Sequence, residues 1–169
     1  LNKGEEVPSQ RFAHVAGDAA LGKPAGMLVL NDSKYGHSLH GSTLAVTLIR
    51  SSYEPDILPE IGEHDVRMAI LPHAGAMPRA EMIRHGAAFN RPLQVVGTGL
   101  HKGRFAATSA GLTAAGPGNV VVSGVTKAET GDDLVVRLYE TDGKACAASL
   151  EFSPAIFGQI ESARETDLL

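Results

Sequence analysis

Short segments in which every second residue is apolar predict that much of this chain is β-structure. Residues 43–49 and 64–71 alternate in this way, and in the second segment Val66, Met68 and Ile70 are expected to face a core. Residues 26–30 are apolar throughout, which is typical of a central strand that is covered on both faces. Glycine and proline residues separate these segments at short intervals, as in an antiparallel sheet with short connections.

Three further β-rich segments occupy the last third of the chain, at residues 120–128, 133–141 and 144–153. Residues 130–132 separate the first two, and the pair Asp142-Gly143 separates the last two. An Asp-Gly pair suits a tight hairpin turn, because glycine readily adopts the positive φ that this turn requires. The order predicts a three-stranded meander. Within it, Cys146 alternates with Leu150 toward the inner face, which predicts a packed core thiol rather than a reactive one.

One segment departs from the period of two. Residues 79–89 follow Pro78, a residue tolerated at the start of a helix, and their apolar positions fit a short helix. Gly86 weakens this helix by up to about 1 kcal/mol relative to alanine. The whole pattern therefore predicts an all-β fold, mainly an antiparallel β-sandwich, with at most one short helix. We expect a β-sandwich over residues 1–105 and a smaller β-meander over residues 106–169 that packs on it or completes it.

Composition narrows the classes of protein that this fold could serve. The 169 residues are 43% hydrophobic and 20% charged, which suits a globular chain with a core. A formal net charge of −4, few aromatic residues and no tryptophan disfavour nucleic-acid binding. No apolar run approaches the roughly 20 residues of a membrane-spanning helix. The single cysteine excludes an internal disulfide and favours a cytoplasmic location.

Histidines are the first candidates for chemistry. His37 and His40 lie three apart, a spacing at which two imidazoles on a helical turn can bind one metal ion, but their glycine-flanked setting favours exposed or hydrogen-bonded loop histidines. His64 and His73 bracket a predicted strand, where a functional role and a hydrogen bond to a loop carbonyl are both open. The chain has no nucleophile-elbow, phosphate-loop or dinucleotide motif, so the residues alone assign no catalytic group.

A polar cluster at residues 31–36 directly follows the most apolar segment. Asparagine, aspartate and serine can close a turn through their own side chains, which is the simpler interpretation. Lys34 and Tyr35 are not required for a turn, and an ammonium beside a phenol could contact a sugar hydroxyl or a carboxylate. A self-contained turn and a functional contact therefore both stay open.

The same cluster opens a longer match. The chain resembles the family 38 glycoside hydrolases, the class II α-mannosidases, in a colinear series of segments: residues 30–38, 41–44, 48–51, 55–56, 62–64, 69–75, 119–122, 127–129, 136–140 and 165–169. The first segment reads Leu-Asn-Asp-Ser-Lys-Tyr-Gly, close to the family pattern. The match extends over nearly the whole chain, and residues 12–22 fit it least well.

The resemblance implies the C-terminal β-domains of such an enzyme, of the galactose-mutarotase-like supersandwich type. In the family, an N-terminal α/β domain holds a zinc ion, an aspartate nucleophile and an acid/base carboxylate for retaining hydrolysis of α-mannosides. Nothing in this chain resembles that domain, so no catalytic or metal-binding residue is carried over and no cofactor is expected here. The resemblance places the zinc in the catalytic domain of a longer parent, with mannose-containing oligosaccharides as the substrate.

A supporting role is also implied, because loops of the C-terminal β region reach toward the catalytic cleft in this family. We expect five residues to line the cleft rim or the interface with the N-terminal catalytic domain of the same polypeptide: Asp32, Lys34, Tyr35, Asp56 and His64. An apolar patch left for that domain could also drive self-association. Two alternatives stay open, a free-standing carbohydrate-binding β-sandwich module and a purely structural or oligomerisation domain.

Overall fold

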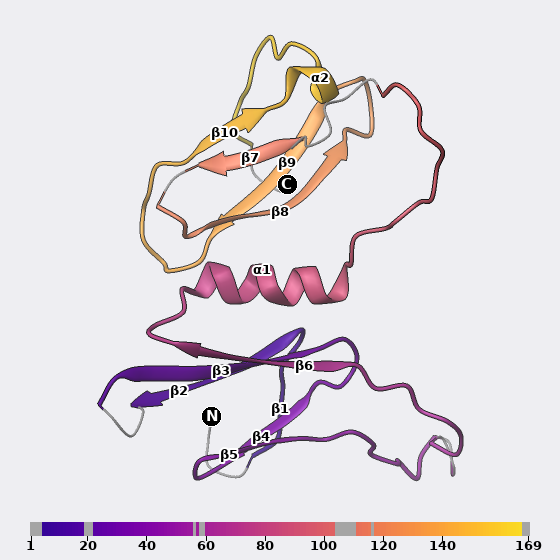
Figure 1. Ribbon diagram of the computed structural model, residues 1–169, viewed down its shortest axis with the longest axis vertical. Coiled ribbons are helices and arrows are strands. Elements are labelled where there is room, and N and C mark those ends of the chain that lie inside the picture. Colours follow the sequence, from indigo (N-terminus) through magenta and orange to yellow (C-terminus); the bar gives the residue numbers. More distant parts are fainter. Residues whose placement is uncertain are drawn as a thin grey trace. The chain divides into compact units, whose positions relative to one another are not determined.

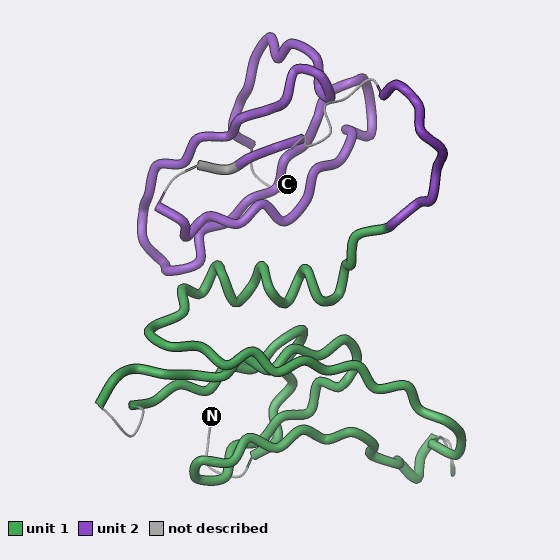
Figure 2. Tube along the Cα trace, in the orientation of Figure 1, with its two compact units in different colours: residues 1–94 green, residues 95–169 purple. Residues whose placement is uncertain are grey.

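The computed structural model describes residues 5–18, 22–55, 57, 60–103, 111–115 and 117–166. The chain forms two compact units, residues 1–94 and residues 95–169, which Figure 2 distinguishes by colour. Unit 1 therefore ends after Gln94, whereas the sequence analysis placed a domain boundary after residue 105. Each unit has its own sheets.

The described residues of unit 1 form two antiparallel sheets and one helix (Figure 1). One sheet has the strand order β1-β4-β5 (Val7–Pro8, Gly36–His40 and Thr43–Val46), and the other has the order β2-β3-β6 (Phe12–Asp18, Pro24–Asn31 and Met68–Ala74). Helix α1 (Arg79–Asn90) runs along one side of the β2-β3-β6 sheet. The β1-β4-β5 sheet lies on the opposite side of the β2-β3-β6 sheet. The middle sheet is thus flanked by the helix and by the second sheet.

The core of unit 1 is built on β3, the central strand that the apolar run at residues 26–30 predicts. Leu28 is fully buried, and Val29 and Leu30 are almost fully buried. Phe12 on β2 pairs with Leu30 and lies against Gly86 of α1. Because paired residues share a face and successive residues alternate, Leu28 and Leu30 face the helix, whereas Val29 faces away from it.

Helix α1 confirms the helix predicted over residues 79–89, and Gly86 lets it approach the sheet closely. A Cβ atom at Gly86 would stand 3.0 Å from Cδ1 of Phe12 and 3.2 Å from Cβ of Arg11. The residue that lowers helix propensity therefore permits the packing. At the end of α1, the Asn90 side-chain amide donates hydrogen bonds to the backbone carbonyls of Asn31 and Gly86, at 3.0 and 2.9 Å. The bond to Asn31 ties the end of α1 to the end of β3.

Strand β6 differs from its prediction in position and in the face that it buries. It begins at Met68 rather than at residue 64, and Ile70, which was expected to face the core, is 65% exposed. Leu71 instead pairs with Leu28 and shares the face that α1 covers. The prediction of an inward Ile70 is wrong, because alternation separates the two faces of a strand without indicating which face is covered.

The outer strands of unit 1 are shorter or less enclosed than the alternating pattern predicts. Strand β5 ends at Val46, so Leu48 and Ile49 are exposed in the connection that follows. In the part of the sheet that the structure describes, β6 is an edge strand, and its Pro72 lies opposite Met27 of β3.

In the part of unit 2 that the structure describes, two antiparallel strand pairs occur, β8-β9 (Val120–Lys127 and Leu134–Glu140) and β10-β7 (Ser149–Phe152 and Leu112–Ala115). One helical turn, α2 (Pro154–Phe157), follows them. The β8-β9 hairpin is as predicted, and its connection contains Gly131 at φ 80°. Val120 and Val121 are buried at one end of β8, whereas Leu134 and Leu138 on β9 are exposed.

The predicted three-stranded meander is wrong in its third strand. Strand β10 begins at Ser149 and pairs with β7 rather than with β9. Cys146, expected in the core, lies outside the strands and is exposed. The carboxylate of Glu140 accepts hydrogen bonds from the backbone N–H groups of Asp142 and Lys144, at 2.6 and 2.9 Å. The Glu140 side chain therefore accepts backbone hydrogen bonds of the turn after β9, and the next strand does not pair with β9.

The fold class is as predicted, since the described residues form mainly antiparallel strands with one longer helix. The single turn α2 is a second helix that the sequence analysis did not predict. Among the described residues, no helix has the length and apolar character needed to cross a membrane.

Candidate functional site

The expected rim residues Asp32, Lys34 and Tyr35 lie together in the turn that follows β3. Ser33 Oγ donates a hydrogen bond to Asp32 Oδ1 at 3.1 Å, and the Tyr35 hydroxyl donates one to the Asp32 backbone carbonyl at 3.5 Å. These contacts support the interpretation of the cluster as a self-contained turn. Lys34 is half-buried, and Tyr35 is 44% exposed, so the phenol edge of the turn is accessible.

The Arg67 side chain, which lies outside this turn in the sequence, contacts Asp32 in the turn. Its Nε lies 3.7 Å from Asp32 Oδ2, and its guanidinium carbon lies 5.4 Å from the centroid of the Phe89 ring. Phe89 belongs to α1 and Arg67 directly precedes β6, so both elements help to position Asp32. Because Arg67 is well exposed and Asp32 is partly exposed, this ion pair contributes little to stability, but it orients the carboxylate.

The other two expected rim residues are not brought to this turn. His64 bonds within its own loop, since its Nε2 lies 2.9 Å from the Glu60 carbonyl oxygen and 3.8 Å from Glu60 Oε2. Asp56 lies outside the described residues. The structure therefore gathers Asp32, Lys34 and Tyr35 by chain proximity and gives His64 a separate, local contact.

The pair His37 and His40 is not arranged for a shared metal ion. Both belong to β4, and their odd spacing puts them on opposite faces of that strand. His37 is 1% exposed and its Nδ1 lies 2.9 Å from the Tyr35 carbonyl oxygen, while its buried Nε2 has no hydrogen-bond partner among the described residues. His40 is exposed at the strand end. His37 is thus hydrogen-bonded, as the favoured interpretation has it, but both histidines belong to a strand rather than to the expected loop.

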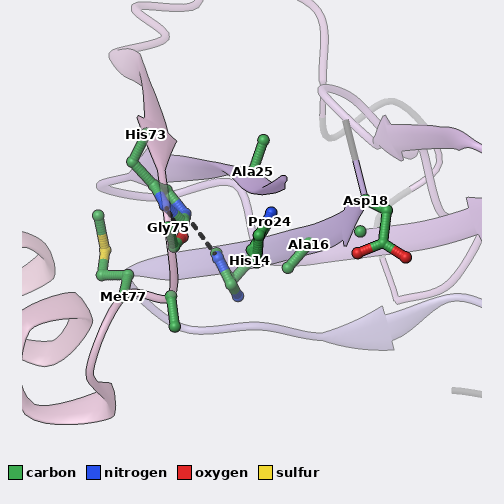
Figure 3. Close-up of a pocket in the computed structure, with 10 residues that line it drawn as sticks. His14, Ala16, Asp18, Pro24, Ala25, His73, Gly75 and Met77 are labelled. Carbon is green, nitrogen blue, oxygen red and sulfur yellow. Dashed lines mark hydrogen bonds between the residues drawn. The ribbon is translucent and has the colours of Figure 1, made fainter. Parts of the chain in front are cut away.

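A site that the sequence analysis did not identify lies on the β2-β3-β6 sheet. His14 on β2 and His73 on β6 meet with their Nε2 atoms 2.9 Å apart (Figure 3). Their ring centroids are 5.1 Å apart, much farther than the facing nitrogens, and their planes are 18° apart. The rings therefore meet nitrogen to nitrogen, nearly in one plane. His73 Nδ1 also lies 3.0 Å from the Gly75 carbonyl oxygen, so the loop-carbonyl interpretation of His73 is correct but incomplete.

The two histidines line a cavity of about 340 Å³. Most other residues of its wall are small, including Ala16, Ala25 and Gly75. Burial lowers the pKa of His14 below its usual value of 6.5, and the positive charge that His73 can carry lowers it further. Both effects favour a neutral imidazole at His14 near neutral pH.

Gly26 makes the contact between the histidines possible. It occupies β3, between the two strands that carry them, and pairs with His73 on one side and with Ala16 on the other. A Cβ atom at Gly26 would stand 2.5 Å from His73 Nε2 and 2.8 Å from the Val15 carbonyl oxygen. The sequence held one signal for this site, a glycine inside the most apolar strand, but only the register shows which side chains use the space.

These features define a β-domain that presents a polar turn and a histidine pair on antiparallel sheets. Among the described residues, no group of three or more histidine, cysteine, aspartate and glutamate side chains is arranged to hold a metal ion.

Comparisons with known proteins identify the family. Residues 2–58 match the model described as the glycosyl hydrolases family 38 C-terminal domain, and residues 119–169 match the family 38 C-terminal beta sandwich domain. Similar proteins include Alpha-mannosidase G of Dictyostelium discoideum, 32% identical over 120 residues, and Alpha-mannosidase 2C1 of Homo sapiens, 34% identical over 121 residues. These alignments cover 71% and 70% of this chain but only 11% of each relative. The chain belongs to the C-terminal region of the family 38 glycoside hydrolases, as the sequence resemblance predicted.

Proposed function

We propose that this chain acts as a noncatalytic C-terminal β-domain of an α-mannosidase, where it supports the catalytic domain and shapes one edge of its cleft. The observation that carries this proposal is the share of each protein that the alignments cover. Proteins named as alpha-mannosidases match about 70% of this chain, yet the chain spans only 11% of their length. The parent enzyme would hydrolyse α-linked mannose in oligosaccharides, in the cytoplasm, and its N-terminal catalytic domain would be the partner of this chain.

Exposed apolar side chains support an extensive partner surface. Leu93, Val95, Val96 and Leu100 lie in the irregular segment after α1, and each is at least 83% exposed. Ile57 and Ile61, in the connection between β5 and β6, are also exposed. Proteins that act as monomers rarely leave large apolar patches uncovered. The proposal assigns these exposed side chains, in each unit separately, to contacts with the remainder of the same polypeptide, since most of the relatives' length lies outside this chain.

The zinc ion and the catalytic carboxylates of the parent are assigned to that remainder. This assignment is consistent with the described residues, in which no cluster of three potential metal ligands occurs. The contribution of this chain to the cleft would come from the turn that contains Asp32, Lys34 and Tyr35, with Asp56 and His64 as further contacts on the rim or at the domain interface. The ammonium of Lys34 and the phenol of Tyr35 are suited to contact substrate hydroxyls.

Hydrolysis of 4-nitrophenyl α-D-mannoside tests the main proposal. The polypeptide that contains this chain and the preceding catalytic domain is expected to hydrolyse the substrate, whereas the 169-residue chain alone is expected to be inactive. Deleting the chain from the longer polypeptide should lower both activity and the temperature of unfolding. Turnover by the isolated chain, or a deletion that leaves activity and stability unchanged, would contradict the proposal.

Variants of the longer enzyme test the rim contact. Lys34→Ala and Tyr35→Phe should raise KM, while Lys23→Ala and Tyr53→Phe, which alter exposed residues outside the turn, serve as matched controls. Equal KM values for the rim variants and the controls would leave the chain with a structural role alone.

Mannose titration of the isolated chain, followed by NMR, separates the proposed role from that of a free-standing carbohydrate-binding module. A scaffold domain should show no saturable shifts. Saturable shifts around Tyr35 or Tyr53 would favour the module, and a defined oligomer without sugar-dependent shifts would favour the structural or oligomerisation role.

A further inference from the structure

Two imidazoles from the outer strands of one sheet meet over its central strand. His14 and His73 belong to β2 and β6, which are both neighbours of β3 and do not pair with each other. Gly26 of β3 has no side chain to obstruct the contact, since a Cβ atom there would clash with the His73 ring. The two Nε2 atoms therefore come within 2.9 Å of each other (Figure 3). Paired strands lie about 4.8 Å apart, so these side chains span two strand spacings in order to meet.

The hydrogen bonds define which nitrogen of His73 carries a lone pair. A carbonyl oxygen only accepts, so the contact of His73 Nδ1 with the Gly75 carbonyl places the proton on Nδ1. In the neutral ring, Nε2 then presents its lone pair to His14. Metal-binding histidines commonly have this arrangement, in which the second ring nitrogen donates to a backbone carbonyl and fixes the tautomer and the ring orientation.

The space around the pair can hold water ligands. The cavity of about 340 Å³ is lined near the imidazoles by small residues such as Ala16 and Gly75. Asp18 lines the same cavity on the same face of β2 as His14, but it is four residues farther along an extended strand, a separation of roughly 13 Å. The described chain thus offers two nitrogen ligands at this position and leaves the remaining coordination positions open.

We propose that His14 and His73 form a binding site for one divalent ion of the late first-row metals, represented by Zn²⁺, with both Nε2 atoms as ligands and water at the remaining positions. Ligand nitrogens lie about 2.0–2.1 Å from zinc, so two nitrogens 2.9 Å apart subtend an angle of about 90° at a shared ion. A modest opening of the pair reaches the tetrahedral angle. The proton on His14 Nε2 moves to its Nδ1 when the ion binds, and the rings turn so that both lone pairs converge.

The chemistry of the donors sets the selectivity of this site. Imidazole nitrogen suits zinc, copper and nickel, whereas magnesium and calcium prefer oxygen ligands. The site differs from the catalytic zinc centre assigned to the parent, because its two protein ligands come from the β2-β3-β6 sheet.

Isothermal titration of the 169-residue chain with ZnCl₂ and with MgCl₂ tests this site. We expect saturable zinc binding with a Kd below about 1 mM and no binding of magnesium. Loss of a residue that only hydrogen-bonds to a metal ligand weakens metal binding roughly 10–100-fold. Because His14→Gln and His73→Gln each remove a ligand itself, each should weaken zinc binding by at least that factor. His40→Gln and His85→Gln are matched controls. His40 is exposed, and the His85 side chain is 40% exposed and pairs with Glu81, where an ion could bind adventitiously.

The nitrogen resonances of the histidine rings provide a second measurement that does not depend on how well a variant folds. In the wild-type chain, zinc should shift the Nε2 signals of His14 and His73 and leave those of His40 and His85 unchanged. Gly26→Ala keeps both ligands but obstructs their approach, so it should weaken zinc binding, whereas Gly124→Ala, which has open space at its Cβ position and lies outside this cavity, should not.

Two results would overturn the proposal. The first is the lack of saturable zinc binding by the wild-type chain, which would leave His14 and His73 as a hydrogen-bonded pair alone. The second is zinc binding that is equally strong in both histidine variants or that shifts the signals of other histidines, which would place the ion elsewhere.

Discussion

Strands β3 and β9 are both rich in apolar residues, yet they are enclosed to different extents. Strand β3 has a hydrogen-bonded neighbour at each edge and a helix over one face, and Leu28 at its centre is fully buried. Strand β9 pairs only with β8 in its described sheet, and Leu134 and Leu138 remain exposed. Apolar content alone therefore does not determine burial. Strand β3 therefore belongs to an enclosed core, whereas β9 leaves apolar side chains exposed.

Truncation of one leucine in each strand should give the largest contrast. Leu28→Ala is expected to cost about 2–5 kcal/mol of unfolding free energy, because it leaves a cavity in an enclosed core. Leu138→Ala should change the stability of the isolated chain by only about 0.5 kcal/mol, as for other exposed positions. Hydrogen exchange resolved for each amide reports the two units separately. Similar losses in both variants would contradict the contrast.

Glycine substitutions should sharpen the same contrast at smaller magnitude. Gly86→Ala improves helix propensity by up to about 1 kcal/mol, but overpacking against Phe12 and Arg11 costs about 1–3 kcal/mol, so net destabilisation is expected. Gly124→Ala on β8 meets open space and should be neutral or slightly stabilising. Denaturant unfolding of the two variants measures both effects. A stabilised Gly86→Ala variant would show that α1 can shift away from the sheet.

As the pH falls, unit 1 should begin to lose stability at a higher pH than unit 2. The loss of stability should be smaller than that caused by the core variants. Burial and the neighbouring His73 lower the pKa of His14 in the folded state, so the unfolded chain binds more protons at mildly acidic pH. The corresponding stability is present above pH 6.5 and is lost as pH falls through the lowered pKa. His14→Gln should flatten this dependence, whereas His85→Gln should preserve it. A pH profile unchanged by His14→Gln would assign the effect to other groups.

The smallest expected effect is the response of unit 2 at lower pH. Desolvation raises the pKa of Glu140, but hydrogen bonds from the backbone of Asp142 and Lys144 and from the Asn119 side chain outweigh it and lower the pKa below 4.5. Stability from this carboxylate is present above pH 4.5 and is lost as pH falls through the lowered pKa. Glu140→Gln should remove this loss, and Glu151→Gln, on the exposed face of β10, should retain it. Unit-specific hydrogen exchange between pH 3 and 5, roughly the range in which carboxylates titrate, measures both.

Local sequence patterns predicted the elements whose causes are local. The apolar run at residues 26–30, the helix after Pro78 and the β8-β9 hairpin all occur as expected. The pairing of β10 with β7 was not predictable in the same way, because it joins segments separated by the whole β8-β9 hairpin. The buried face of β6 also depends on the position of α1, which alternation within the strand does not encode.

The same distinction between local and distant causes applies to the candidate sites. The turn at Asp32, Lys34 and Tyr35 was visible because its residues are neighbours in sequence. The pair of His14 and His73 was not, because it depends on two strand registers and on the glycine between them. Residues 12–22 fit the family pattern least well, so the resemblance gave no reason to examine His14.

Pro72 has a consequence for encounters between separate molecules. Proline has no N–H group, so within a continuous ladder to β3 its nitrogen must lie on the outer side of β6. An edge strand with an unbroken row of N–H donors is a template for strand addition from another chain. Pro72 removes one donor from the middle of that row. The edge that exposes Ile70 is therefore a poor template for β-aggregation, even though its outward side chain is apolar.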